Sequence, residues 1–133
     1  MSKYKMQKSE AEWKAALSQE EYHILRQAGT EYPFTGKYNN HKAKGTYNCK
    51  GCGTPLYSST AKFDSGCGWP SYDKSIDGAI EYRKDTSIGM LRVEILCATC
   101  GGHQGHIFDD GTTATGQRYC VNSASIDFTP EED

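Results

Sequence analysis

The sequence predicts a mainly β protein built from two antiparallel β-sheets, with short helices before them. From residue 45 onward, short apolar or β-branched segments alternate with glycine, proline and aspartate turns, which is typical of packed antiparallel strands. Helix-capping signals occur in the first third of the chain. Two C-x2-C cysteine pairs stand far apart in the strand-rich part, so one shared site could fasten the two sheets together.

Length and charge limit the classes of protein to consider. A chain of 133 residues is expected to form one domain, 1–133, with a helical arm at 1–35, a β core at 45–128 and a loose acidic tail at 129–133. The net charge of −2 offers no basic excess for nucleic acid. We find no apolar run of roughly 18 residues that could span a membrane. The N-terminus lacks the apolar region of a secretory signal. A mitochondrial presequence that has been removed is left as an alternative.

Two short helices are expected in the arm. Ser9 is placed to cap a helix that runs to Leu17. Ser18 and Glu21 have the spacing of a capping box, which opens a second helix that ends before Gly29. The sequence Tyr-Pro-Phe at 32–34 then breaks the helical pattern.

The β core is expected to contain seven strands. The strand pattern occurs at 45–48, 55–58, 80–84, 91–97, 106–108, 118–121 and 125–128. Asp77 and Gly78 have the composition of a hairpin-type turn.

The two C-x2-C pairs have the spacing of zinc ligands. Each short loop lets two thiolates converge on one ion, and four sulfur ligands favour a structural ion over a catalytic one. Two disulfides or two redox C-x2-C motifs are the alternatives, but a redox motif usually opens a helix and neither pair does. We expect one structural Zn²⁺, which would join the chain near residue 50 to the chain near residue 98. Its ligands are Cys49, Cys52, Cys97 and Cys100.

Cys120 lies in an expected strand whose neighbours are chemically unusual. Alternation along a strand places Arg118, Cys120 and Asn122 on one face. The positive charge of Arg118 would favour a thiolate and so raise the reactivity of Cys120. A packing cysteine in an edge strand is the alternative.

Cys67 lies between Gly66 and Gly68, in a segment expected to be a loop that can move. A thiol that must travel to meet another thiol needs such a setting. Trp69 offers an indole that could cover an apolar ligand, although a tryptophan in the core is the commoner case.

Two histidines follow the second cysteine pair. His103 and His106 could act as acids, hydrogen-bond donors or metal ligands, and Asp110 could orient one of the rings. Because four sulfurs are already available for the metal, we place both histidines outside its coordination sphere. Solvent-exposed histidines on a glycine-rich loop are the alternative.

These motifs, taken in order, closely resemble the methionine-R-sulfoxide reductase (MsrB) family over residues 9–128. The resemblance rests on Gly-Cys-Gly-Trp-Pro-Ser around Cys67, on the segment from Cys97 to His106, on Asp110-Gly111 and on Arg-Tyr-Cys-x-Asn-Ser around Cys120. Enzymes of this family reverse the oxidation of methionine to its sulfoxide, a role implied by the resemblance and not deduced from residue spacing. Gln104, Tyr72 and Thr112 depart from the common pattern, but none removes a group that the reaction needs.

The resemblance implies a β-tent-like fold and a role for each motif residue. It implies that Cys120 is the nucleophile, Cys67 the resolving thiol and Trp69 the residue that receives the S-methyl group. It further implies a polar pocket around the sulfoxide, formed by His103, His106, Asp110, Arg118 and Asn122.

The expected activity is thiol-dependent reduction of methionine-R-sulfoxide, mainly in proteins, with thioredoxin as the reductant. Oxidised proteins or peptides would be the substrates, and we expect a cytoplasmic monomer. Three rival classes are a zinc-stitched binding module, a zinc-ribbon nucleic-acid binder and a zinc deaminase. The module would need no reactive thiol pair, the binder conflicts with the acidic charge, and the deaminase motif is absent from the sequence.

Overall fold

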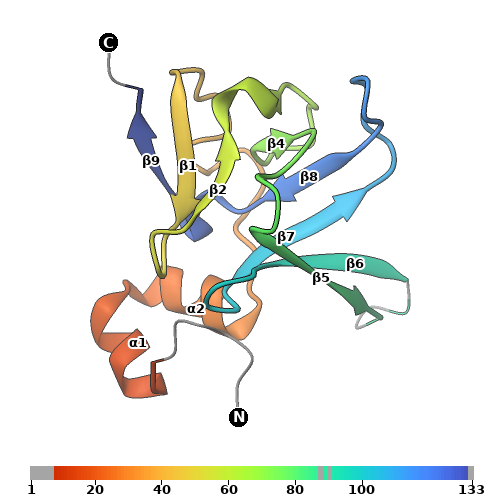
Figure 1. Ribbon diagram of the computed structural model, residues 1–133. Coiled ribbons are helices and arrows are strands. Elements are labelled where there is room, and N and C mark those ends of the chain that lie inside the picture. The colour runs from red at the N-terminus through yellow and green to blue at the C-terminus, as the bar shows by residue number, and fades with distance from the viewer. Residues whose placement is uncertain (1–7, 87–88, 90, 132–133) are drawn as a thin grey trace.

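The computed structural model describes residues 8–86, 89 and 91–131, which form two antiparallel sheets and two short helices (Figure 1). The smaller sheet has the strand order β2-β1-β9, and the larger has the order β3-β4-β8-β7-β6-β5. The mainly β architecture expected from the sequence is therefore confirmed. The strands are β1 Gly45–Cys49, β2 Pro55–Ser58, β3 Lys62–Phe63, β4 Ser71–Tyr72, β5 Ile80–Asp85, β6 Arg92–Cys97, β7 His103–Phe108, β8 Arg118–Val121 and β9 Ile126–Pro130.

Both helices begin at the predicted caps, and Ser9 forms a capping box with Glu12 as Ser18 does with Glu21. Helix α1 spans Glu10–Ala16 and helix α2 spans Gln19–Gln27. In the second box, the Ser18 hydroxyl accepts from the Glu21 N–H at 3.1 Å, and the Glu21 carboxylate accepts from the Ser18 N–H at 2.9 Å. These reciprocal bonds satisfy N–H groups that a helix start would otherwise leave without partners. Neither helix in the described residues has the length and apolar character needed to cross a membrane.

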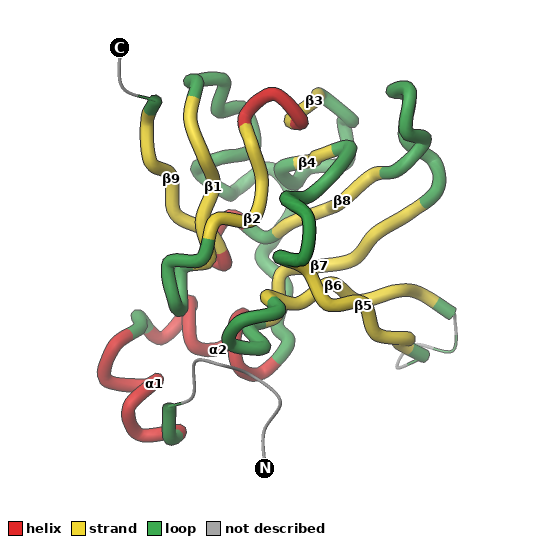
Figure 2. The backbone as a smooth tube through the Cα atoms, in the orientation of Figure 1, coloured by secondary structure: helices red, strands yellow, loops and turns green. Residues whose placement is uncertain are grey.

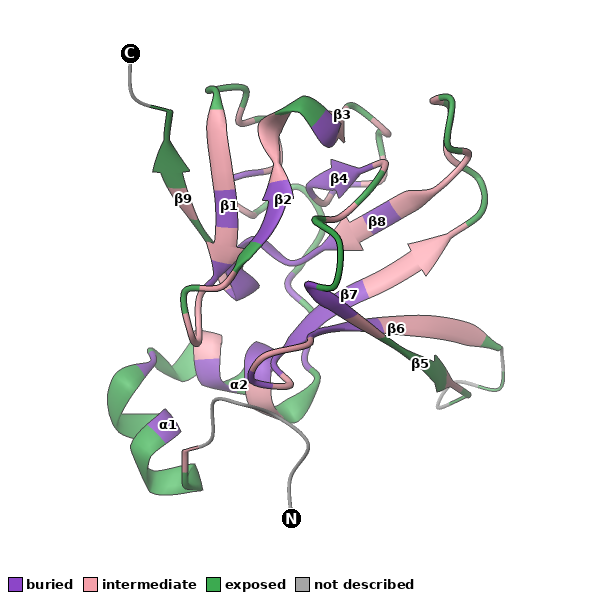
Figure 3. Ribbon diagram, in the orientation of Figure 1, coloured by how far each residue is buried: buried purple, intermediate pink, exposed green. Residues whose placement is uncertain are grey.

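The helices cover one end of the two sheets, and only one stripe of each is buried (Figure 3). The Trp13 ring is 2% exposed and lies under the Arg26 guanidinium, 4.5 Å from the ring centroid. Arg26 also donates to the carbonyl oxygen of Cys100 at 3.0 Å. The helical arm is thus attached directly to one of the turns that carry the paired cysteines.

Tyrosine rings pack the interior between the sheets. Tyr47 of β1 and Tyr57 of β2 belong to the smaller sheet, and Tyr72 of β4 belongs to the larger one; all three are 0% exposed. Tyr57 stacks on Tyr72 with ring centroids 4.4 Å apart, and Tyr47 meets Tyr72 edge to face at 5.2 Å. These aromatic contacts add to the hydrophobic gain that holds the sheets together.

Several boundaries differ from the sequence predictions. β3 and β4 contain two residues each, which is too short for an alternating pattern to be visible. β7 begins at His103 rather than at 106. Asp77 and Gly78 do form a turn, but the turn leads from β4 to β5, and these strands do not pair. The hairpin expected there is wrong.

The expected loose tail at 129–133 is also wrong for the residues that the structure describes. Thr129 and Pro130 belong to β9 and pair with Thr46 and Gly45 of β1. The Glu131 N–H then donates to the carbonyl oxygen of Lys44 at 2.9 Å. Backbone pairing therefore continues past the last apolar residue, and 132–133 lie outside the described residues.

Candidate active site

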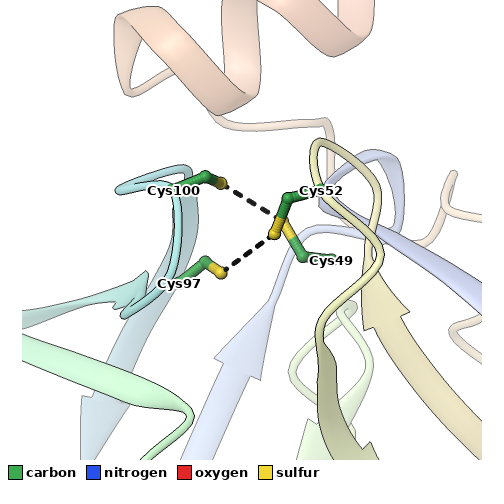
Figure 4. Close-up of side chains that lie close together, drawn as sticks. All are labelled: Cys49, Cys52, Cys97 and Cys100. Atoms are coloured by element: carbon green, nitrogen blue, oxygen red, sulfur yellow. Dashed lines mark hydrogen bonds between the residues drawn. The ribbon is translucent and has the colours of Figure 1, made fainter. Parts of the chain in front are cut away.

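The four cysteines of the C-x2-C pairs converge on one point at the helical end of the sheets (Figure 4). Cys49 ends β1 and Cys52 lies in the turn that follows, whereas Cys97 ends β6 and Cys100 lies in the turn between β6 and β7. Their Sγ atoms all lie within 4.8 Å of one another. The Sγ–Sγ distance is 3.6 Å for Cys49 with Cys100 and 3.6 Å for Cys52 with Cys97.

The geometry of this cluster fits a tetrahedral zinc ion. Metal–sulfur bonds of about 2.3 Å at tetrahedral angles place neighbouring sulfurs roughly 3.8 Å apart, close to the two distances observed. Each turn is closed by a glycine at positive φ: the N–H of Gly53 donates to the Cys49 carbonyl, and that of Gly101 to the Cys97 carbonyl, both at 2.8 Å. With four thiolates and no open position, such a site would be structural.

The remaining two cysteines meet on the larger sheet, 53 positions apart in sequence. Cys120 lies in β8, and Cys67 lies in the loop at 64–70 that joins β3 to β4 (Figure 2). Their Sγ atoms are 3.6 Å apart and both residues are partly exposed. A disulfide bond is about 2.05 Å long, so a shift of roughly 1.5 Å would join them.

Hydroxyl groups surround Cys67. Its Sγ accepts from Ser65 Oγ at 3.0 Å and lies 3.4 Å from the Oγ of Ser71, which faces Cys120 across the β4–β8 pairing. The Cys120 thiol, followed by these hydroxyls, lowers the pKa of Cys67 to about 4. Cys67 and burial raise the pKa of Cys120, while Arg118 opposes the rise. The two sulfurs therefore share one proton and one negative charge.

A row of side chains continues from Cys120 across the sheet. His106 of β7 pairs with Cys120, and Glu94 of β6 pairs with His106, so their side chains lie on one face. His106 Nε2 lies 2.7 Å from Asp85 Oδ2, and His103 Nδ1 lies 2.6 Å from Glu94 Oε2. Burial is the largest influence on His106 and lowers its pKa, although the bond to Asp85 works against it.

A pocket of about 220 Å³ opens beside the thiol pair. This volume is below the roughly 300–1,000 Å³ typical for drug-sized ligands, so it suits a single side chain. Its walls combine the sulfurs of Cys67 and Cys120 with one imidazole, two guanidinium groups and two aromatic rings. The lining residues are Thr30, Cys67, Trp69, Arg92, Gly105, His106, Phe108, Arg118, Cys120 and Asn122.

Comparison with known proteins agrees with this arrangement. Residues 17–130 match the family model described as the SelR domain. The chain is 51% identical to the peptide methionine sulfoxide reductase MsrB of Methanosarcina mazei, with 100% of this chain and 96% of that protein covered. It is 56% identical to the protein of the same name from Acinetobacter baylyi, with 96% and 93% covered. The chain belongs to the MsrB family.

In this MsrB protein, most of the residues singled out by sequence lie at the pocket. Cys67, Trp69, His106, Arg118, Cys120 and Asn122 all line it. His103 does not; it lies behind His106, 4% exposed, with its ring centroid 5.7 Å from that of His106. The alternative of two solvent-exposed histidines is therefore wrong.

Two of the sequence-predicted residues make contacts that the sequence did not predict. Among the described residues, the Asp110 carboxylate binds Arg118 and not a histidine, with distances of 2.7 Å to Nε and 3.0 Å to Nη2. Asn122 is 3% exposed and its amide holds the backbone, accepting from the N–H of Glu31 at 3.1 Å and donating to the carbonyl of Gln104 at 3.2 Å.

Sequence reasoning missed the carboxylates that hold the imidazoles of this MsrB chain. Asp85 ends β5 and Glu94 lies in the middle of β6, so both come from strands without a recognised motif. Arg92 was missed as well; its Nη2 donates to Asp85 at 3.1 Å. The one available signal was alternation, since Arg92 and Glu94 interrupt an apolar strand at every second position.

Proposed function

We propose that this chain reduces the R epimer of methionine sulfoxide in proteins and peptides, with Cys120 as nucleophile and Cys67 as resolving thiol. The observation that carries the proposal is the 3.6 Å approach of the two sulfurs at the wall of a pocket of one side chain's size. An imidazole and a second thiol lie beside the same sulfur, which are the groups that sulfoxide reduction requires.

In the first step, the sulfur of Cys120 attacks the sulfur of the sulfoxide. Its proton passes to Cys67, with which it is already shared, and His106 donates a proton to the sulfoxide oxygen. The oxygen is transferred to Cys120, which becomes a sulfenic acid, and methionine leaves with its sulfur reduced by two electrons. We assign the proton donor to His106 rather than His103 because only His106 lines the pocket.

In the second step, the Cys67 sulfur attacks the sulfenic sulfur of Cys120. The Cys67–Cys120 disulfide forms, and the hydroxyl group leaves as water after it takes up the proton that Cys67 releases. The hydroxyls of Ser65 and Ser71, 3.0 Å and 3.4 Å from the Cys67 sulfur, would stabilise the thiolate that makes this attack. A dithiol such as thioredoxin then reduces the disulfide by thiol exchange and returns both cysteines to the thiol state.

Trp69 is proposed to receive the S-methyl group and thereby select the epimer. Its indole lines the pocket beside Cys67, and its Nε1–H donates to the carbonyl oxygen of Glu31 at 3.1 Å, which fixes the plane of the ring. An apolar wall on one side of Cys120 and a proton donor on the other would accept only one arrangement of methyl group and oxygen around the sulfur.

The four-cysteine cluster is proposed to hold a structural Zn²⁺ that takes no part in the reaction. When bound, it would fix the turn after β1 to the turn between β6 and β7, directly ahead of His103 and His106. Denaturation in the presence of a chelating dye should release about one zinc per chain. Four disulfide-bonded cysteines without zinc would overturn this assignment. We further propose that the protein is cytoplasmic, since reduced thiols suit a reducing compartment. We also propose that it is a monomer.

Reduction of each methionine sulfoxide epimer with dithiothreitol tests the proposed function. We expect turnover of the R epimer by the unaltered protein and none by Cys120→Ser. Turnover of the S epimer alone would contradict the proposal, and so would unchanged turnover by the Cys120→Ser protein.

A further inference from the structure

Two large rings stand exposed in a turn beside the loop of Cys67. Tyr32 is 83% exposed and Phe34 is 69% exposed; with Leu91, also 69%, they are the most exposed large apolar side chains of the described residues. The turn is closed by Thr35, whose N–H and hydroxyl both donate to the carbonyl of Tyr32, at 3.3 Å and 2.6 Å. We call residues 32–35 the aromatic turn.

The aromatic turn is fastened to the residue after Cys67. The N–H of Phe34 donates to the carbonyl oxygen of Gly68 at 2.7 Å. Gly68 has φ +97°, and a Cβ there would lie 2.6 Å from Pro33 Cβ and 3.1 Å from the ring of Phe34. The turn and the cysteine loop are thus packed against each other with no room for a side chain between them.

Phe34 adopts a backbone conformation that costs energy for a residue with a bulky side chain. Its φ of +67° lies in the left-handed region, which bulky residues seldom enter. Strain of this kind persists where the surrounding contacts impose it, and it is concentrated at functional sites. Here the strained residue directs its ring outward beside a reactive sulfur.

The segment before the turn is held firmly, so the rings stand on a rigid base. Glu31 is 8% exposed; its carboxylate accepts from the N–H of Ala124 at 3.1 Å, and its own N–H donates to Asn122. Its carbonyl oxygen accepts from Trp69. A surface ordered before binding loses less entropy when a partner arrives.

We propose that the aromatic turn is the docking surface for a protein dithiol reductant of the thioredoxin class. The proposal rests on the proposed function, in which the Cys67–Cys120 disulfide must be reduced by an outside thiol. A protein cannot enter a pocket of about 220 Å³, so its thiol reaches Cys67 from outside the loop. Transient redox contacts bury less than about 1,200 Å² in total, or roughly 600 Å² per partner, and a turn packed on Gly68 falls inside an area of this size centred on Cys67. Exposed aromatic rings are typical energetic centres of protein interfaces.

Docking at the aromatic turn would lead to thiol exchange at Cys67. A thiolate of the reductant attacks the Sγ of Cys67, a mixed disulfide forms, and Cys120 leaves with the electron pair of the broken S–S bond. The second thiolate of the reductant then attacks the reductant's own sulfur in the mixed disulfide, and Cys67 leaves. The reductant is oxidised to its disulfide, and its two protons end on Cys67 and Cys120.

Steady-state kinetics with thioredoxin and with dithiothreitol test the proposal. The variants are Tyr32→Ser and Phe34→Asn; asparagine tolerates positive φ, so the second removes the ring without adding backbone strain. The control is Ile76→Ser, an exposed apolar residue (38%) whose N–H bonds to Leu56 of β2 in the other sheet. We expect kcat/KM for thioredoxin to fall about tenfold in the two variants and to hold in the control. Dithiothreitol-supported turnover should change less than about twofold, because a small dithiol needs no docking surface.

Three results would overturn the proposal. One is an unchanged kcat/KM for thioredoxin in both variants. Another is an equal fall in turnover when dithiothreitol is the reductant and an oxidised peptide is the substrate, with no fall when free methionine sulfoxide is the substrate. That result would make the aromatic turn a substrate-binding surface. The third is a loss as large in Ile76→Ser. Absence of dithiothreitol-supported turnover in the unaltered protein would instead contradict the proposed function itself.

A trapping experiment gives a second readout that does not depend on turnover. Thioredoxin whose second active-site cysteine is replaced by serine should form a lasting mixed disulfide with the oxidised protein at Cys67. We expect this adduct to form about tenfold more slowly with Tyr32→Ser than with the unaltered protein or with Ile76→Ser. Equal rates for all three would overturn the docking surface even if every activity were intact.

Discussion

The two cysteine sites share a sulfur–sulfur distance but differ in the number of sulfurs and in their neighbours. Two of the Sγ–Sγ distances in the four-cysteine cluster are 3.6 Å, and the Sγ atoms of Cys67 and Cys120 are also 3.6 Å apart. In the cluster, four sulfurs meet under the helical arm, and the hydroxyl of Thr54 lies 3.1 Å from the Cys52 sulfur. In the pair, two sulfurs meet at a pocket wall with serines and an imidazole around them. Under the proposed function, the number of sulfurs and their neighbours, rather than the distance between sulfurs, separate the structural site from the redox site.

Exchanging one cysteine from each site for serine should have the largest effects and should separate the two roles. Cys97→Ser leaves three thiolates, and we expect loss of bound zinc and a fall of more than about 5 kcal/mol in the free energy of unfolding, because metal-binding energy is folding energy here. Cys120→Ser should abolish turnover and change the free energy of unfolding by less than about 1 kcal/mol. Denaturant unfolding and zinc content measure both. If Cys97→Ser and Cys120→Ser lowered the free energy of unfolding equally, the two cysteine sites would not differ in their contribution to stability.

His106→Gln should slow the first chemical step by about 10²–10⁴-fold, because glutamine cannot donate a proton as an acid. In the unaltered protein this step needs an ionised thiol pair, available above a pKa of about 4, and a protonated His106, available below a pKa that lies under 6.5. Single-turnover rates should therefore peak between these limits and fall as the pH rises toward about 7. A profile that keeps the same falling limb in His106→Gln would assign the acid to another group.

Cys67→Ser should retain one turnover and lose thioredoxin-dependent cycling, since the sulfenic acid forms but has no partner. The same change removes the largest influence that raises the pKa of Cys120, so Cys120 should ionise at lower pH. Rates of alkylation by iodoacetamide as a function of pH measure that shift. Normal cycling with thioredoxin in Cys67→Ser would show that the resolving thiol is a different residue.

Glu31→Gln should have the smallest effect, and it should depend on pH. Burial raises the pKa of Glu31 above 4.5, so the folded protein binds this proton more tightly than the unfolded chain does. The stabilising contribution is complete below pH 4.5 and is lost as the pH rises through the raised pKa. Because water still screens part of this charge, the unaltered protein should lose less than about 1 kcal/mol relative to Glu31→Gln over that interval, measured by urea unfolding. If the difference in stability between the two proteins did not change with pH, ionisation of Glu31 would not be its cause.

Most features of the fold that could be predicted from the sequence are set by residues close together in the chain. The capping boxes at Ser9 and Ser18 involve residues three apart, and the C-x2-C turns involve their immediate neighbours, so both are visible in the chain itself. β3 and β4 could not be found, because two residues show no period, and because β4 pairs with β8, which lies far along the chain. The β9 pairing of Thr129 and Pro130 depends likewise on β1.

Site residues that belong to a sequence motif could be predicted. Site residues that are brought to the site by the register between strands could not. The meeting of Cys67 with Cys120 was expected from the family resemblance, not from spacing. The bonds of Asp85 to His106 and of Glu94 to His103 follow from the alignment of β5, β6 and β7, which no local pattern sets. Asp110 was assigned to a histidine by proximity in sequence, whereas β8 brings Arg118 to it.

Mapping the thiols after one turnover tests the separation of the two sites most directly. The reduced, zinc-loaded protein is mixed with one equivalent of methionine-R-sulfoxide, alkylated, and examined by native mass spectrometry and by peptide mapping. We expect one new disulfide, between Cys67 and Cys120, with the zinc retained and Cys49, Cys52, Cys97 and Cys100 reduced. A disulfide that involves any of those four, or zinc released in step with methionine formed, would contradict this separation.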